Sequence, residues 1–104
     1  MFEKDLSLAL LYDLYSALLS EKKREVFEGY FLSDLSLAEI AEETGTSRQA
    51  VRDLISRTKG DLTFFEEKIG LMQKRNQLLS LCDALEQAQP EELEVLIQRI
   101  REVL

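Results

Sequence analysis

Apolar residues recur at spacings of three and four along the chain, and no segment alternates apolar and polar residues as a half-buried strand does. This spacing gathers apolar side chains on one face of an α-helix, so it restricts the chain to helices packed on helices. Four glycines and one proline among 104 residues leave few breaks between the helices. The sequence therefore predicts an all-α fold.

Capping residues and helix breakers predict where the helices begin and end. Ser20 is a candidate N-cap, and Pro90, followed by two glutamates, suits the first turn of a helix. The expected helices span residues 5–19, 21–32, 37–44, 48–70 and 71–88, with a last helix from Pro90. The last helix should have one apolar face, formed by Leu93, Leu96, Ile97, Ile100 and Leu104.

The segment SLAEIAEETGTSRQAV contains two helix caps around one glycine. Ser36 and Glu39 have the spacing of a capping box, in which each side chain satisfies a free amide at a helix start. Gly45 can supply the left-handed turn that ends this short helix. Ser47 then caps a further helix that begins at Arg48. Two capped helices joined by a glycine turn match the helix-turn-helix motif.

The apolar positions of this further helix alternate steps of four and three, a period of 3.5 that is typical of a coiled-coil seam. The series is Val51, Ile55, Thr58, Leu62, Phe65, Ile69, Met72, Asn76 and Leu79. Gly60 and Gly70 interrupt it, and each would destabilise a helix interior by about 1 kcal/mol relative to alanine. One long helix and two helices with a bend both fit, and we expect a helix that reaches at least Gly70.

The seam can lie within one chain or between two copies. A chain this short has more apolar surface, in its first helix and along the seam, than one small bundle covers, which predicts a homodimer. We therefore expect a helix-turn-helix domain with the N-terminal helix over residues 1–60, and a helical extension that serves dimerisation over residues 61–104.

Residues 45–60 form a basic island in an acidic chain. They carry four basic side chains and one acidic one, a net charge of +3, whereas residues 1–46 carry −6 and residues 61–104 carry −4. At 100° per residue, nearly all polar side chains of the helix that starts at Arg48 lie opposite its apolar ones. We expect Val51, Leu54 and Ile55 on the buried side.

Such a basic face predicts DNA binding, because arginine and glutamine can read guanine and adenine, and lysine or arginine can neutralise phosphates. The residues expected in the groove are Ser47, Arg48, Gln49, Arg52 and Ser56, and those expected on the DNA backbone are Arg57 and Lys59. A solvated helix face without a function is the alternative interpretation. The cap–glycine–cap pattern favours DNA.

The stretch LYDLYSALLSEKKREVFEGYFLSDLSLAEIAEETGTSRQAVRDLISRT resembles the YlxM family of small bacterial helix-turn-helix proteins and, more distantly, region 4 of sigma factors. SLAEIAEETGTSRQAV is the most specific part. The resemblance implies a DNA-binding regulator, a link to the signal recognition particle pathway and a dimer. Thr44 and Thr46 replace larger apolar residues at the turn, which predicts looser packing there. Arg52 and Leu54 replace an expected aromatic residue and an asparagine.

The acidic remainder of the chain favours a second function. The two acidic blocks suit a basic protein or ribonucleoprotein, so the helical domain could be an adaptor that binds a signal recognition particle component or RNA polymerase without reading DNA. RNA binding is a third and weaker alternative, since the aromatic platforms of single-strand binders are not evident.

Enzymatic activity is not expected. The chain has no histidine, the commonest general base and metal ligand, and no phosphate-binding glycine loop or metal-ligand spacing. We therefore expect no catalytic residue, cofactor or metal, and we place the single cysteine, Cys82, in the core. No apolar run reaches the roughly 20 residues of a membrane span. Glu3, Asp5 and Asp13 argue against a signal peptide, and a lone cysteine fits the cytoplasm.

Overall fold

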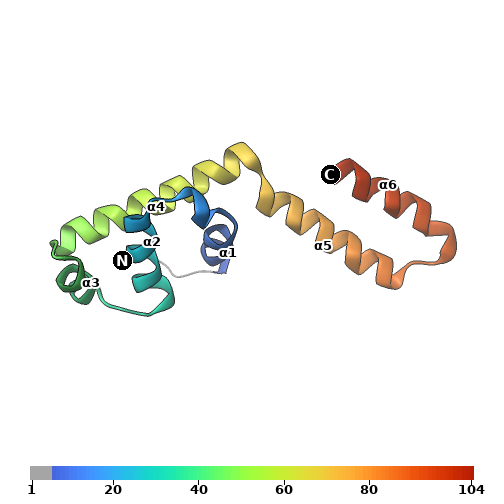
Figure 1. The fold of residues 1–104 in the computed structure, drawn as a ribbon. Coiled ribbons are helices and arrows are strands. Elements are labelled where there is room, and N and C mark those ends of the chain that lie inside the picture. Colours follow the sequence, from blue (N-terminus) through green and yellow to red (C-terminus); the bar gives the residue numbers. More distant parts are fainter. Residues whose placement is uncertain (1–5) are drawn as a thin grey trace. The chain divides into compact units, whose positions relative to one another are not determined.

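The computed structural model describes residues 6–104, and its regular elements over that range are all helical (Figure 1), which confirms the all-α prediction. The α-helices are α1 (Leu6–Tyr15), α2 (Glu21–Phe27), α3 (Leu37–Thr44), α4 (Arg48–Ile69), α5 (Leu71–Gln87) and α6 (Leu93–Val103). Three short turns extend them: η1 (Ser16–Leu18), η2 (Glu28–Leu32) and η3 (Pro90–Glu92). Asp5, the expected first residue of the first helix, lies outside the described range.

The predicted caps are present as hydrogen bonds. Ser36 Oγ accepts from the Glu39 amide at 3.0 Å, and Glu39 Oε1 accepts from the Ser36 amide at 3.1 Å, so the capping box at the start of α3 is confirmed. Ser47 Oγ accepts from the amide of Ala50 at 3.0 Å at the start of α4. Ser20 Oγ accepts from the amide of Lys23 at 3.3 Å at the start of α2.

Gly45 ends α3 in the left-handed conformation, with φ 69° and ψ 29°. The amide of Thr46 donates to the carbonyl of Ala41 at 3.0 Å, and the Gly45 amide donates to that of Glu42 at 3.4 Å. This pair of bonds is a Schellman motif, which satisfies the last carbonyls of the helix. The chain is thereby turned from α3 into α4 over three residues.

The chain divides into two compact units after Ile69. In the first unit, α4 lies alongside α1 and α2, with α3 at its N-terminal end (Figure 1). The first unit has two apolar clusters, and each of them includes residues of α4. One cluster joins α2, η2, α3 and the start of α4, and consists of Val26, Tyr30, Leu37, Ile40, Ala41, Val51 and Ile55. The other joins α1, α2 and the middle of α4, and consists of Leu8, Tyr12, Tyr15, Leu19, Phe27 and Leu62.

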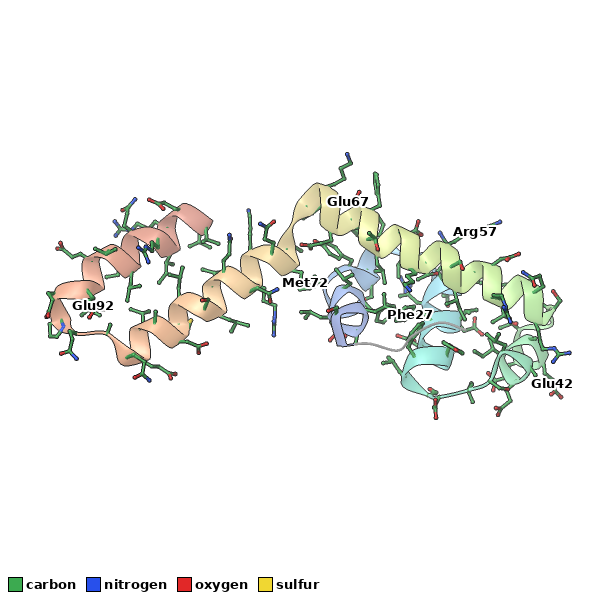
Figure 2. The ribbon with its side chains drawn as sticks, turned by 180° about the vertical axis from the view of Figure 1, so that it is seen from behind. Phe27, Glu42, Arg57, Glu67, Met72 and Glu92 are labelled. Carbon is green, nitrogen blue, oxygen red and sulfur yellow. The ribbon has the colours of Figure 1, made fainter. Side chains whose placement is uncertain are left out.

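An aromatic stack connects the two clusters. The Phe27 ring, labelled in Figure 2, points into the first unit. It lies 4.4 Å, centroid to centroid, from both Tyr12 and Phe31. Phe31 packs against both clusters. The hydroxyl of Tyr15, buried on α1, donates to Glu66 Oε1 on α4 at 2.7 Å. The N-terminal helix therefore contacts α4 along the second half of that helix.

Helix α4 is continuous through Gly60 and ends before Gly70, whose φ of 72° is left-handed. The first part of the predicted seam is internal, because Val51, Ile55 and Leu62 are buried inside the first unit. Leu62 and Phe65 pack with α1, so this unit extends beyond residue 60, where the sequence suggested a domain boundary.

The second unit is a hairpin of α5 and α6. Pro90 is the first residue of η3, which leads into α6 as expected. Leu96 is the one buried apolar residue of this unit, whereas several large apolar side chains are exposed: Leu71, Leu79, Leu93, Val95, Ile97 and Leu104. Cys82 is exposed on α5, so its expected place in the core was wrong. A hairpin has one internal face, and Cys82 lies off it.

Candidate nucleic-acid interface

The structure presents the predicted reading residues on the first turns of α4. Ser47 caps the helix, and Arg48, Gln49, Arg52 and Ser56 are all exposed. Since the side chains project from consecutive turns of one helix, they form a narrow polar strip of the kind that a DNA groove accommodates.

The opposite side of the same turns is anchored. Val51 is 1 % exposed and Ile55 is 0 % exposed, in the cluster that also holds Ile40 and Ala41 of α3. Leu54 packs against this cluster while remaining partly exposed. The small Ala41 side chain lets α3 and α4 approach closely. The side of α4 opposite the polar strip is therefore packed into the core of the first unit.

A shallow open depression lies between the first turns of α3 and α4. It is lined by Ser36, Leu37, Ala38, Arg48, Gln49 and Arg52. The structure thus brings three predicted residues together with the N-cap and the first two residues of α3, which the sequence interpretation did not assign to the site. The capping box was the available signal for these three, because it marks the first turn of the leading helix in the motif.

The other predicted residues lie apart from this depression. Ser56 lies one turn beyond Arg52 along the strip, and Lys59 is half-buried. Arg57 projects from the face of α4 turned away from α1 and α2 (Figure 2), about 180° around the helix from Arg48. The seven predicted residues are therefore one cluster of three with four flanking positions.

Asp53 also belongs to this face, although the sequence interpretation gave it no role. Gln49 Nε2 donates to Asp53 Oδ1 at 2.9 Å, one helical turn away. The bond constrains a side chain that was expected to read a base. Its signal in the sequence is the spacing of four between a glutamine and an aspartate.

A pair of hydroxyls holds the turn between the two helices. Thr44 Oγ1 donates to the carbonyl of Ile40 at 2.8 Å and lies 2.9 Å from Thr46 Oγ1. Because the single Thr44 hydroxyl proton is used on Ile40, Thr46 is the donor to Thr44. The sequence predicts looser packing at these threonines, and in the structure a hydrogen bond between their side chains spans Gly45.

Within residues 6–104 no group of three or more cysteine, aspartate or glutamate side chains is placed to hold a metal ion. Over the same range, no helix has both the length and the apolar character needed to cross a membrane.

Comparison with known proteins identifies the family. Residues 2–103 match the family described as "Putative helix-turn-helix protein, YlxM / p13 like", a description that names no enzymatic activity. A UPF0122 protein of Thermoanaerobacter sp. strain X514 is 41% identical over 97 residues, which is 93% of this chain and 80% of the relative. One from Halalkalibacterium halodurans is 44% identical over 105 residues, 96% of each chain. One from Listeria innocua is 46% identical over 86 residues, covering 83% and 78%. The chain belongs to the YlxM / p13-like helix-turn-helix family (UPF0122).

Proposed function

We propose that the protein is a cytoplasmic DNA-binding regulator that inserts the first turns of α4 into the major groove. The observation that carries this proposal is the exposed Arg48, Gln49 and Arg52 beside the first turn of α3, on a helix whose other side is buried. In this position the arginines can bond in bidentate fashion to guanine and Gln49 can bond to adenine. Ser47 and Ser56 complete the groove contacts, and Arg57 and Lys59 contact phosphates.

The overall net charge of −7 is compatible with this function. Salt screens exposed charges over about 8–10 Å, so a phosphate on the polar strip interacts mainly with the basic side chains next to it. Non-specific binding is almost entirely electrostatic, and the acidic remainder should weaken it. We therefore expect a binder that depends on base contacts more than most helix-turn-helix proteins do.

The test is selection of bound sequences from a random DNA library, followed by titration of the selected site. Replacing Arg48 and Arg52 with alanine should weaken binding to that site at least about 30-fold, because each lost bidentate pair costs about 1–3 kcal/mol. Arg99→Ala with Arg101→Ala is the matched control, since it removes the same charge from exposed positions on α6. Absence of binding by the unaltered protein at low salt, or equal losses in both variants, would contradict the proposal.

We further propose that the protein acts as a homodimer joined through the second unit. A hairpin with one buried apolar side chain has too small a core to be stable alone. The exposed residues Leu93 and Ile97 of α6 and its C-cap residue Leu104 fall within an arc of about 40° around the helix axis. Two such stripes can cover each other in a four-helix arrangement, and a two-fold axis would also present two α4 helices to two half-sites.

Molar mass measured by sedimentation over a range of concentrations tests the dimer. Ile97→Glu places a charge on the exposed stripe and should shift the protein to a monomer, whereas Gln98→Glu adds the same charge one position along α6, off the stripe, and should leave the dimer intact. A monomer at all concentrations for the unaltered protein, or dissociation by both substitutions, would contradict this arrangement.

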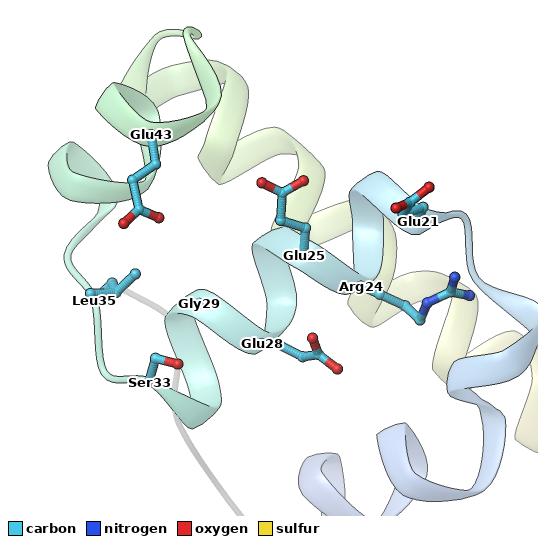
Figure 3. Close-up of a pocket in the computed structure, with 8 residues that line it drawn as sticks. All are labelled: Glu21, Arg24, Glu25, Glu28, Gly29, Ser33, Leu35 and Glu43. Atoms are coloured by element: carbon cyan, nitrogen blue, oxygen red, sulfur yellow. The ribbon is translucent and has the colours of Figure 1, made fainter.

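A second candidate function, an adaptor for a basic partner, is favoured by an acidic depression on the first unit (Figure 3). Its lining includes Glu21, Glu25, Glu28 and Glu43. Glu25 of α2 and Glu43 of α3 extend toward the same space (Figure 3). Arg24 also lines the depression, but its guanidinium donates to the carbonyl of Leu19 at 2.7 Å and is thus directed at the connection between α1 and α2.

The partner in this second proposal is a basic component of the signal recognition particle or of RNA polymerase. Binding to each purified assembly can be measured before and after Glu21, Glu25 and Glu43 are changed to glutamine. Loss of binding with this variant, but not with Glu91, Glu92 and Glu94 changed to glutamine on the second unit, would support the adaptor. Unchanged binding of both assemblies by the first variant would contradict the depression as the binding surface. Absence of binding by the unaltered protein, with DNA selection intact, would leave DNA binding as the function.

A further inference from the structure

The negative charge of Asp53 is unfavourable on a surface that is proposed to bind DNA. It is the single acidic side chain in residues 45–60, and a carboxylate beside phosphates repels them. Its bond to Gln49 on the exposed face of α4 gives it a use, since Gln49 Nε2 donates to Asp53 Oδ1 at 2.9 Å. Support of an isolated helix by a pair four residues apart is a small effect. The bond also restricts the orientation of the Gln49 side-chain amide.

A glutamine amide turns freely about its last side-chain torsion, so it can present either its oxygen or its nitrogen to a given neighbour. An ionised aspartate only accepts hydrogen bonds. Asp53 can therefore hold only the nitrogen side of the Gln49 amide, and the orientation with the oxygen toward Asp53 is repelled. The bond selects one of the two orientations of the amide.

The held amide still has one N–H and its carbonyl oxygen available. In the major groove adenine offers an acceptor at N7 and a donor at N6, which this pair of groups matches. Guanine offers two acceptors at the same edge, so the carbonyl oxygen of the held amide would face an acceptor. A fixed orientation should thus increase discrimination for adenine and against guanine.

The position of Asp53 around the helix assigns it a supporting place. Taking Arg48 as zero, Arg52 lies at about 40°, Gln49 at about 100° and Asp53 at about 140°. The depression between α3 and α4 is lined by Arg48, Gln49 and Arg52 and does not include Asp53. Gln49 therefore stands between Asp53 and the centre of the reading surface.

We propose that Asp53 is a positioning residue, which orients the Gln49 amide so that α4 selects adenine at one position of its target. This inference rests on the proposed DNA-binding function. Asp53 sets which base is preferred at that position and contributes little to the total affinity, since the loss of its bond and the loss of its charge act in opposite directions on DNA binding.

The experiment is sequence selection with the full-length protein and its variants. The unaltered protein should enrich adenine at one position, and Gln49→Ala should identify that position by losing the enrichment. Asp53→Ala should reduce the adenine preference at the same position about five- to tenfold, with total affinity unchanged or higher. Asp53→Glu, which retains an acceptor in reach of Gln49, should restore most of the preference, an outcome that a merely structural role does not predict.

A control separates the charge of Asp53 from its bond. Glu42→Ala removes one exposed acidic side chain from α3 and should raise affinity slightly without changing the base preference. Binding by the unaltered protein combined with an unchanged adenine preference in Asp53→Ala overturns the inference and leaves the proposed function standing. A change at a different position, with cytosine lost, also overturns it, because Asp53 would then contact a base directly. No DNA binding by the unaltered protein overturns both.

Discussion

Tyr12 lies where the N-terminal helix meets the aromatic stack, and its hydroxyl donates to Glu28 Oε1 at 2.8 Å. Burial, together with the bond to Glu28 and the charge of that carboxylate, raises the pKa of Tyr12 from 10.0 to about 12. Between these values the folded protein keeps a proton that the unfolded chain releases. The Tyr12 hydroxyl therefore contributes its full stabilisation below pH 10. The free energy of unfolding should fall as the pH rises from 10 to 12.

Comparison of the unaltered protein with Tyr12→Phe isolates this effect. The difference between their free energies of unfolding should shrink by about 1 kcal/mol between pH 9 and pH 11.5. This value is smaller than the full pKa shift implies, because water screens the exposed Glu28. Urea denaturation at both pH values measures it. A difference that stays constant would mean that the hydroxyl ionises at its ordinary pKa in the folded protein.

At the scale of the helices, two glycines predict opposite effects of the same substitution. Gly60 lies in the interior of α4 with open space where a methyl group would stand, so Gly60→Ala should stabilise the protein by about 0.5–1 kcal/mol. Gly45 has equal space but a φ of 69°, so Gly45→Ala should destabilise it by about 1–2 kcal/mol. Gly45→Asn should be tolerated better, since asparagine adopts this conformation more readily.

Urea denaturation of the three variants gives the comparison directly. Destabilisation by Gly60→Ala would show that α4 bends at this glycine. Equal effects at both glycines would show that backbone conformation does not decide the outcome.

The elements that the sequence predicted best are those decided by nearest neighbours. The capping box at Ser36, the turn at Gly45 and the start of α4 at Arg48 each depend on a few adjacent residues. The π-helical turn η2 depends instead on tertiary packing, as Tyr30 is held in one cluster and Phe31 packs against both. No local pattern specifies such a widening of a helix.

Positions around a helix were predicted less well than positions along it. Periodicity identified Val51 and Ile55 as buried, but it did not reveal which partner covers each arc of the helix. The half-buried position of Lys59 and the exposure of Cys82 depend on how closely neighbouring helices approach. The bond between Gln49 and Asp53 was readable from their spacing, yet whether a side chain uses such a neighbour is decided by its rotamer.

For the whole molecule, the distribution of charge sets how DNA binding should respond to salt. The chain has four basic side chains in residues 45–60, while its pI is about 4.6. Two of them, Arg57 and Lys59, are proposed to neutralise phosphates, so log K should fall with log salt concentration with a slope of about −1.8 per bound chain. Titration of the selected site between 50 mM and 200 mM salt measures this slope. A much steeper slope would reveal phosphate contacts by basic residues other than these two.

The exposure of Cys82 has a practical consequence. It is the one cysteine of the sequence, and it lies on α5, in a different unit from Arg48, Gln49 and Arg52. A maleimide fluorophore will attach to the unaltered protein at this single, known position. Protein labelled separately with a donor and an acceptor dye, then mixed, will show energy transfer when two copies associate. The same label, paired with a dye on one end of a DNA duplex, will report by energy transfer whether the protein binds the duplex and how far Cys82 then lies from that end.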